Sequence, residues 1–187
     1  MKKFLLLLLV AGSVTASAQT NPAREGFATG YLINSSNDKL EGFIKESFKK
    51  GTISFNTASG INKSYTPADI NEFAIGQDLY VAYMNDFYKV TSAGTKGSLL
   101  QKVTNNKGKM LYNGSDAYVA TTTDGKIGDF YLKIKATEKV ALVTKQNFEN
   151  VFASFCGDCT ALQTNIQGKQ LDYSSLEKAV EQYNNCN

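Results

Sequence analysis

Short stretches in which apolar and polar residues alternate run from residue 27 to residue 143, and they constrain the fold more than any other feature of this sequence. Period-two alternation is typical of strands with one buried face. Gly, Asn and Asp separate the stretches, and no helical period lies between them, which predicts an antiparallel β-meander, either a sandwich or a partly open barrel. Residues 92–98 are predicted to form a mobile loop. The clearest alternations are Ile53/Phe55, Phe73/Ile75, Leu79/Val81/Tyr83, Phe130/Leu132/Ile134 and Val140/Leu142.

After Val143 the apolar residues recur with the spacing of amphipathic helices. Ser174 followed by Glu177 has the form of a capping box, so the last helix is expected to begin there. The sequence predicts an α+β fold in which a β-rich body (27–143) is followed by a tail of two to three short helices (144–187) packed on it. The helical stripes are Phe148/Val151/Phe152/Phe155, Leu162/Ile166 and Leu176/Ala179/Val180/Tyr183.

The first eighteen residues have the form of an export signal. Lys2 and Lys3 precede an apolar run from residue 4 to residue 11, and Ala16-Ser17-Ala18 offers a cleavage site. The run is too short to span a bilayer, which needs about 20 apolar residues. The first cysteine is Cys156, so a lipoprotein anchor is not expected. We therefore expect residues 19–187 to form a single exported domain without a transmembrane segment, located in the periplasm, at the outer membrane or outside the cell.

The composition limits which catalytic sites, metal sites and partners can be expected. The chain has no histidine, which excludes His-dependent catalytic triads and His-ligated zinc. It has neither an acidic metal-binding loop nor a Gly-rich phosphate loop, so no metal or cofactor is expected. Without residues 1–18, 20 Lys and Arg become 18 against 17 Asp and Glu, a net charge of +1. The lysines form only short clusters, Lys49-Lys50 and Lys107/Lys109, so nucleic acid is not expected as a partner.

Three cysteines in the tail allow two interpretations. Cys156-Gly157-Asp158-Cys159 has the C-x-x-C form of a thioredoxin active site, but an amphipathic helix precedes it and no proline follows Pro67. Alternatively, helices starting near Asp158 and Ser174 form an antiparallel hairpin. Cys159 at the start of one then lies beside Cys186 at the end of the other, and a disulfide between them leaves Cys156 as a buried free thiol. Cys156 could also replace Cys159 as the partner of Cys186.

Carboxylates and tyrosines are weaker indications of a catalytic or ligand-binding site. The carboxylates that could form an acid/base pair are Asp69, Glu72, Asp86, Asp116, Asp124 and Asp129, but their spacing selects no two of them, so no catalytic residue is assigned. Many tyrosines fall in predicted strands, where those on the solvent face could contact a peptide or a sugar. The tyrosines considered as ligand contacts are Tyr80, Tyr83, Tyr88, Tyr112 and Tyr131.

The order of short motifs resembles a family of uncharacterised exported β-rich proteins of Gram-negative bacteria, a domain of unknown function. The resemblance rests on Gly30-Tyr31-Leu32-Ile33, Leu40-Glu41-Gly42-Phe43-Ile44, Ile53-Ser54-Phe55, Tyr65-Thr66-Pro67-Ala68-Asp69-Ile70 with Phe73, Phe130-Tyr131-Leu132, and Cys159, Leu162 and Tyr183-Asn184-Asn185-Cys186. It implies an envelope-directed β-rich domain without a known activity. Cys156 has no counterpart in the pattern.

Together these features favour a non-catalytic binding or scaffolding module for an envelope protein, a peptide or a glycan, and the expectation leans away from an enzyme. Two alternatives remain at this stage. One is a thiol-disulfide oxidoreductase that uses Cys156 and Cys159, and the other is a carboxylate-dependent hydrolase of envelope polymers.

Overall fold

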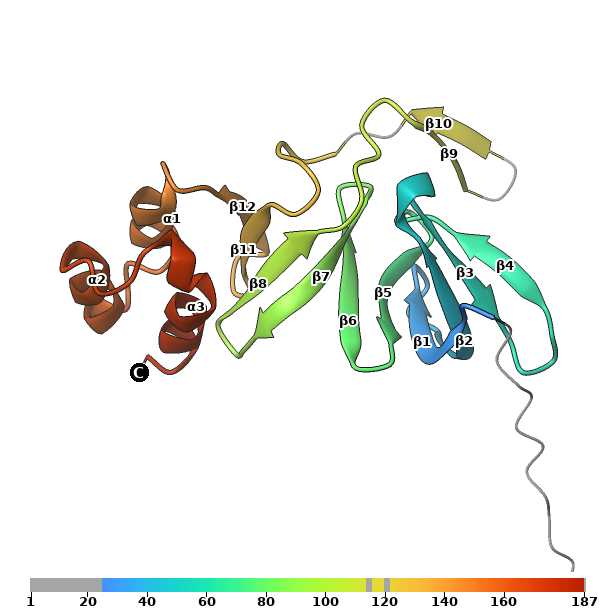
Figure 1. Ribbon diagram of the computed structural model, residues 1–187, viewed down its shortest axis with the longest axis horizontal. Helices are drawn as coiled ribbons and strands as arrows, with labels where there is room; N and C mark the ends of the chain where they lie inside the picture. Colours follow the sequence, from blue (N-terminus) through green and yellow to red (C-terminus); the bar gives the residue numbers. More distant parts are fainter. Residues whose placement is uncertain (1–24, 114–115, 120–121, 187) are drawn as a thin grey trace, which may run out of the picture.

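The computed structural model describes residues 25–113, 116–119 and 122–186; the expected signal segment 1–18 lies outside them. In this part of the chain, ten strands form one antiparallel sheet in the order β12-β11-β8-β7-β6-β5-β1-β2-β3-β4, and β9 and β10 form a separate hairpin (Figure 1). The strands are β1 (Ala28–Asn34), β2 (Lys39–Ser47), β3 (Thr52–Asn56), β4 (Asn62–Tyr65), β5 (Ile70–Ile75), β6 (Asp78–Tyr83), β7 (Asp86–Ala93), β8 (Gly97–Lys102), β9 (Met110–Asn113), β10 (Asp116–Val119), β11 (Phe130–Ile134) and β12 (Lys139–Val143).

The sheet is open, but its β1–β5 half must curl strongly. Only residues 66–69 join β4 to β5, and five peptide links reach at most about 18 Å. A turn in which the Asp69 N–H donates to the Thr66 carbonyl shortens this reach further. In a flat sheet β4 and β5 would lie four strand spacings apart, about 19 Å. The antiparallel prediction is confirmed, and the sandwich alternative is wrong because one curled sheet replaces two stacked ones.

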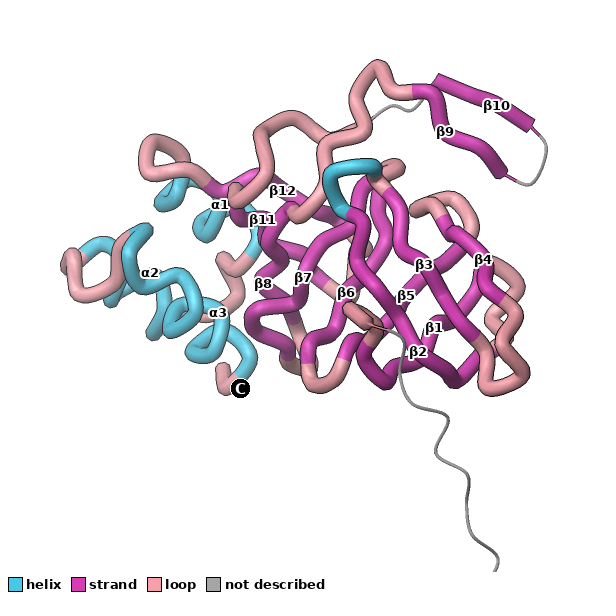
Figure 2. The backbone as a smooth tube through the Cα atoms, turned by 45° about the vertical axis from the view of Figure 1, so that its right-hand side comes forward, coloured by secondary structure: helices cyan, strands magenta, loops and turns pink. Residues whose placement is uncertain are grey.

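The curl encloses the first of the apolar cores. Tyr65 on β4, Phe73 on β5 and Phe87 on β7 belong to one buried cluster, although β4 and β7 are far apart in the strand order. The short 3-10 helix η1 (Phe48–Lys50) lies at one end of the curled half (Figure 2). Its Phe48 ring lies 5.4 Å from Tyr80 and 6.4 Å from Phe73 and Phe87. This half therefore has the geometry of a partly open barrel.

The helical tail covers the other half of the sheet, as predicted. It consists of α1 (Phe148–Phe155), α2 (Thr160–Gln167), the 3-10 turn η2 (Tyr173–Ser175) and α3 (Leu176–Asn184) (Figure 1). These helices share a second buried cluster with β8, β11 and β12, in which Leu99 and Leu132 from strands join Phe152, Leu162 and Val180 from helices. None of the helices in the described ranges is long and apolar enough to cross a membrane.

Two local predictions are corrected. The capping box is formed by Asp172 and Ser175 around η2, not by Ser174 and Glu177, because the chain makes a 3-10 turn before α3 begins. Of the loop expected at 92–98, residues 92–93 belong to β7 and residues 97–98 to β8, so the connection consists of residues 94–96. The N–H groups of Lys96 and Gly97 each donate to Asn184 Oδ1 at 2.9 Å, which attaches this connection to α3.

Candidate binding groove

The cysteines take a structural arrangement. Cys159 caps the start of α2 and is disulfide-bonded to Cys186, just after α3, with a Cα–Cα distance of 5.8 Å. Cys156 ends α1 as a fully buried free thiol. Burial raises the pKa of this thiol to about 12, and Asp158 contributes in the same direction. In this arrangement the two cysteines of the C-x-x-C motif are not linked to each other, and the Cys156 thiol is held in its protonated, unreactive form.

Most of the tyrosines considered as ligand contacts lie in the interior. Tyr80, Tyr88 and Tyr131 are at most 5% exposed, so these three rings do not lie on the solvent face where the prediction placed them. The reason is that both faces of the central strands are covered, one by the curl and the other by residues 122–125, where Thr123 Oγ1 and the Asp124 carbonyl bond the Tyr88 and Tyr131 hydroxyls. Tyr83 is half-buried, and Tyr112 is 59% exposed.

Three of the candidate carboxylates are hydrogen-bonded to neighbouring groups. Asp69 Oδ2 accepts from the Thr66 N–H and hydroxyl, Asp129 Oδ2 accepts from the Lys126 N–H, and Glu72 accepts from the Tyr31 hydroxyl at 2.8 Å. These bonds hold turns and strand neighbours in place. Among the described residues, no three or more Asp, Glu, Cys or His side chains gather in a way that could hold a metal ion.

A buried ion pair is the polar feature that sequence reasoning missed. Lys102 Nζ lies 3.2 Å from Asp86 Oδ2, and both side chains are fully buried. Burial raises the pKa of Asp86 above its ordinary value, while Thr104, Asn106 and Lys102 act in the opposite direction. Asp86 stood among the six candidate carboxylates, but no local signal separates Lys102 from the other strand lysines.

The ion pair holds both ends of the segment that carries β9 and β10. Asp86 Oδ1 accepts from the Thr104 hydroxyl and the Asn106 N–H, each at 2.9 Å. Lys102 Nζ donates to Thr122 Oγ1 at 3.0 Å and to the Thr123 carbonyl at 2.9 Å. We refer to the β9–β10 hairpin as the arm, and to the Asp86–Lys102 pair with these partners as the arm clamp.

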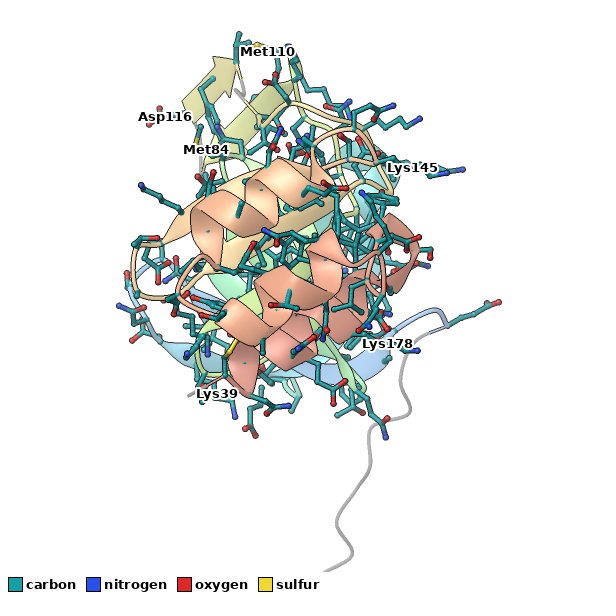
Figure 3. All side chains as sticks on the ribbon, turned by 90° about the vertical axis from the view of Figure 1, so that its left-hand side faces the viewer. Lys39, Met84, Met110, Asp116, Lys145 and Lys178 are labelled. Atoms are coloured by element: carbon teal, nitrogen blue, oxygen red, sulfur yellow. A yellow bond between two sulfur atoms is a disulfide. The ribbon has the colours of Figure 1, made fainter. Side chains whose placement is uncertain are left out.

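The arm is apolar on both of its faces. Leu111 is 3% exposed, and the Tyr118 hydroxyl on the same face donates to Asn85 Oδ1 at 3.5 Å, so this face packs on the body. On the opposite face, Met110, Tyr112 and Val119 are 53–63% exposed. Figure 3 shows Met110 and Asp116 at the tip of the molecule, with Met84 below them. Exposed apolar clusters of this kind mark interaction sites.

A groove of about 470 Å³ lies between the arm and the β3–β4 end of the body. Three consecutive residues of β9 and two consecutive residues of β4 line it. Since neighbouring side chains of a strand point to opposite faces, consecutive lining residues place the groove along the strand edges rather than on a face. We call this space the arm groove; its lining residues are Lys50, Thr52, Lys63, Ser64, Thr66, Asp69, Met110, Leu111 and Tyr112.

Both edges are unpaired in the described part of the chain. β4 is the last strand of the main sheet, and β9 has β10 as its single neighbour. Each therefore presents backbone N–H and C=O groups without a strand partner, which is the arrangement that accepts an added strand. Tyr112 is the one predicted contact residue that this groove contains.

Comparison with protein-family models, curated proteins and solved structures finds no match to this chain. The resemblance to exported β-rich proteins therefore stays an expectation from the sequence, and the function is argued from the geometry of the arm groove.

Proposed function

We propose that this chain is a non-catalytic protein-binding module of the bacterial envelope, and that it accepts an extended peptide segment of its partner in the arm groove. The observation that carries the proposal is the groove between two unpaired strand edges, β4 and β9. A peptide in this space can extend the arm as a third strand through its backbone, while its side chains contact exposed apolar residues of the arm.

The arm clamp supports this function. A binding edge has to be held in position before the ligand arrives, because ordering it on binding costs free energy. Asp86 and Lys102 attach both ends of the arm segment to the rigid sheet, so the edge of β9 is preorganised. Asp69, the carboxylate that lines the groove, accepts two bonds from Thr66 and holds the turn before β5.

The proposal is tested by selecting a phage-displayed library of random linear peptides on the purified protein and then titrating a synthetic copy of an enriched peptide. We expect Tyr112→Ala to weaken binding of this peptide about tenfold, since aromatic contact residues commonly contribute more than 1 kcal/mol. Ile61→Ala is the matched control, because Ile61 is 66% exposed but does not line the groove. Its affinity should equal that of the wild type.

Hydrogen exchange shows whether the peptide pairs with the strand edge. Bound peptide should slow amide exchange at residues 110–112, where β9 lines the groove. The proposal fails if the library yields no enriched peptides, or if enriched peptides bind Tyr112→Ala as tightly as the wild type and leave exchange at 110–112 unchanged.

A further inference from the structure

Lysines from three separate segments lie at the arm groove or close to it in the chain. Lys50 and Lys63 line the groove, and Lys49, Lys107 and Lys109 are within three residues of a lining residue. Lys49 and Lys50 belong to η1, Lys63 belongs to β4, and Lys107 and Lys109 lie in the turn before β9. Lys109 Nζ donates to the Lys49 carbonyl at 3.4 Å, so the fold joins the two short lysine clusters that are far apart in the sequence.

These five ammonium groups make no ion pair with the described residues, whereas six lysines elsewhere do. Lys63 Nζ instead stands 4.6 Å above the centre of the Tyr65 ring. Two carboxylates are found in the groove wall and the arm. Asp69 lies in the wall, and its Oδ2 already accepts two bonds from Thr66; Asp116 lies on the arm and is exposed. Positive charge therefore exceeds negative charge around the groove.

We propose that the peptide segment bound in the arm groove is acidic, with Asp or Glu residues alternating with apolar ones. This inference rests on the proposed function. An added strand places alternate side chains on opposite faces of the arm. One set then meets the exposed apolar face with Met110 and Tyr112, and the other meets the lysines of η1 and β4. Like charges around the groove disfavour a basic segment, so the lysines also select against wrong partners.

The inference is tested with three fluorescent peptides of equal length in which Val and Tyr alternate with Glu, with Gln or with Lys. We expect the Glu peptide to bind tightest, the Lys peptide to bind weakest, and added salt to weaken the Glu peptide alone. In Lys63→Gln/Lys109→Gln the affinity for the Glu peptide should fall about fivefold, since each exposed ion pair contributes a fraction of a kcal/mol to about 1 kcal/mol. Affinity for the Gln peptide should not change.

The matched control is Lys145→Gln/Lys178→Gln. It removes the same charge from two exposed lysines that lie away from the arm in Figure 3 and make no ion pair with described residues. Its affinity for the Glu peptide should equal that of the wild type. Equal loss in both double variants would mean that overall charge, not the groove, attracts the peptide, and would overturn the inference.

The remaining outcomes separate the inference from the function. If the Gln and Glu peptides bind equally and Tyr112→Ala weakens both, the acidic partner is refuted while the peptide-binding function stands. If heparin binds through Lys63 and Lys109 while no peptide binds, the ligand is an anionic glycan, and both proposals fail. Dimerisation of the protein that requires Tyr112, without peptide binding, would assign the groove to a second copy of the chain and refute both as well.

Discussion

At the scale of residues, burial determines which polar side chains can contact a ligand. Three tyrosines that alternation placed in strands are interior, because the curl encloses Tyr80 and residues 122–125 cover Tyr88 and Tyr131. Period-two alternation identifies which residues share a face, but it does not say what covers that face. Tyr112 remains on the surface because it belongs to the arm, whose outer face the described residues do not cover.

The first prediction concerns Cys156. Burial raises the pKa of its thiol to about 12 from an ordinary 9.0, so below pH 9 the thiol is protonated in both the folded and the unfolded chain. As the pH rises from 9 toward 12, only the unfolded thiol ionises, and the free energy of unfolding should fall. Urea denaturation on either side of pH 9 measures this fall, which Cys156→Ala should reduce.

Iodoacetamide should label Cys156 in urea but not in the native protein; rapid native labelling would contradict the assignment.

At the scale of elements, periodicity predicts the strands and the helical stripes, and it fails where side chains from distant elements meet. The helical spacing of Phe148 and Phe152 predicts a helix here, and α1 is found at this position. β4 and β9 are distant in the sequence but line the same groove, and no residue pattern in either strand predicts that they lie close together. The arm clamp is equally hidden, since Asp86 and Lys102 have the sequence context of ordinary strand-end residues.

The second prediction tests the arm clamp. Lys102→Met leaves the Asp86 carboxylate buried without its ion-pair partner, and should lower the free energy of unfolding by about 3–5 kcal/mol. Asp86→Asn/Lys102→Met removes both charges and should recover part of this loss. Amide exchange in β9 and β10 should accelerate more than exchange in β1 and β2. These changes are measured by urea denaturation and by hydrogen exchange.

The control for the clamp is Lys169→Met, which breaks the exposed pair between Lys169 and Glu149. Surface pairs contribute about 0–1 kcal/mol, so this variant should unfold close to the wild type. If Lys102→Met is no more destabilising than Lys169→Met, the buried pair does not hold the arm.

The third prediction concerns the helical tail. The Cys159–Cys186 bridge closes a loop with a sequence separation of 27, and chain entropy gives about 3–4 kcal/mol for such a loop. Cys186→Ser should therefore lower the free energy of unfolding by about this amount, whereas Cys156→Ser should not remove a bridge. Non-reducing peptide mass spectrometry identifies the linked pair. A Cys156–Cys159 link would refute the arrangement and revive the redox interpretation.

At the scale of the whole molecule, the arm is an insertion between two neighbouring strands of the sheet, β8 and β11. β8 pairs directly with β11 over five residue positions, so the segment between them leaves and returns without interrupting the ladder. The α+β class and the meander could be predicted from the sequence. The curl could not, because it depends on the short connection between β4 and β5.

The fourth prediction follows from this insertion. Replacing residues 110–119 by a short Gly-Ser linker should leave the far-ultraviolet circular dichroism of the sheet and helices largely unchanged. The free energy of unfolding should fall by about 1–3 kcal/mol, because the contact of Leu111 with the body is lost. Peptide binding should disappear. A variant that unfolds completely would show that the arm is part of the core instead.

The attachment of Asn184 to Lys96 and Gly97 also has a consequence for biosynthesis. Its hydrogen bonds join residues 87 and 88 positions apart, and they form in the last helix of the chain. A ribosome completes β8, β11 and β12 before it makes α3, so their apolar face lacks the part of its cover that α3 supplies until this helix has been synthesised. The order of synthesis therefore places the closing of this core, and the fastening of the β7–β8 connection, after the whole sheet has been made.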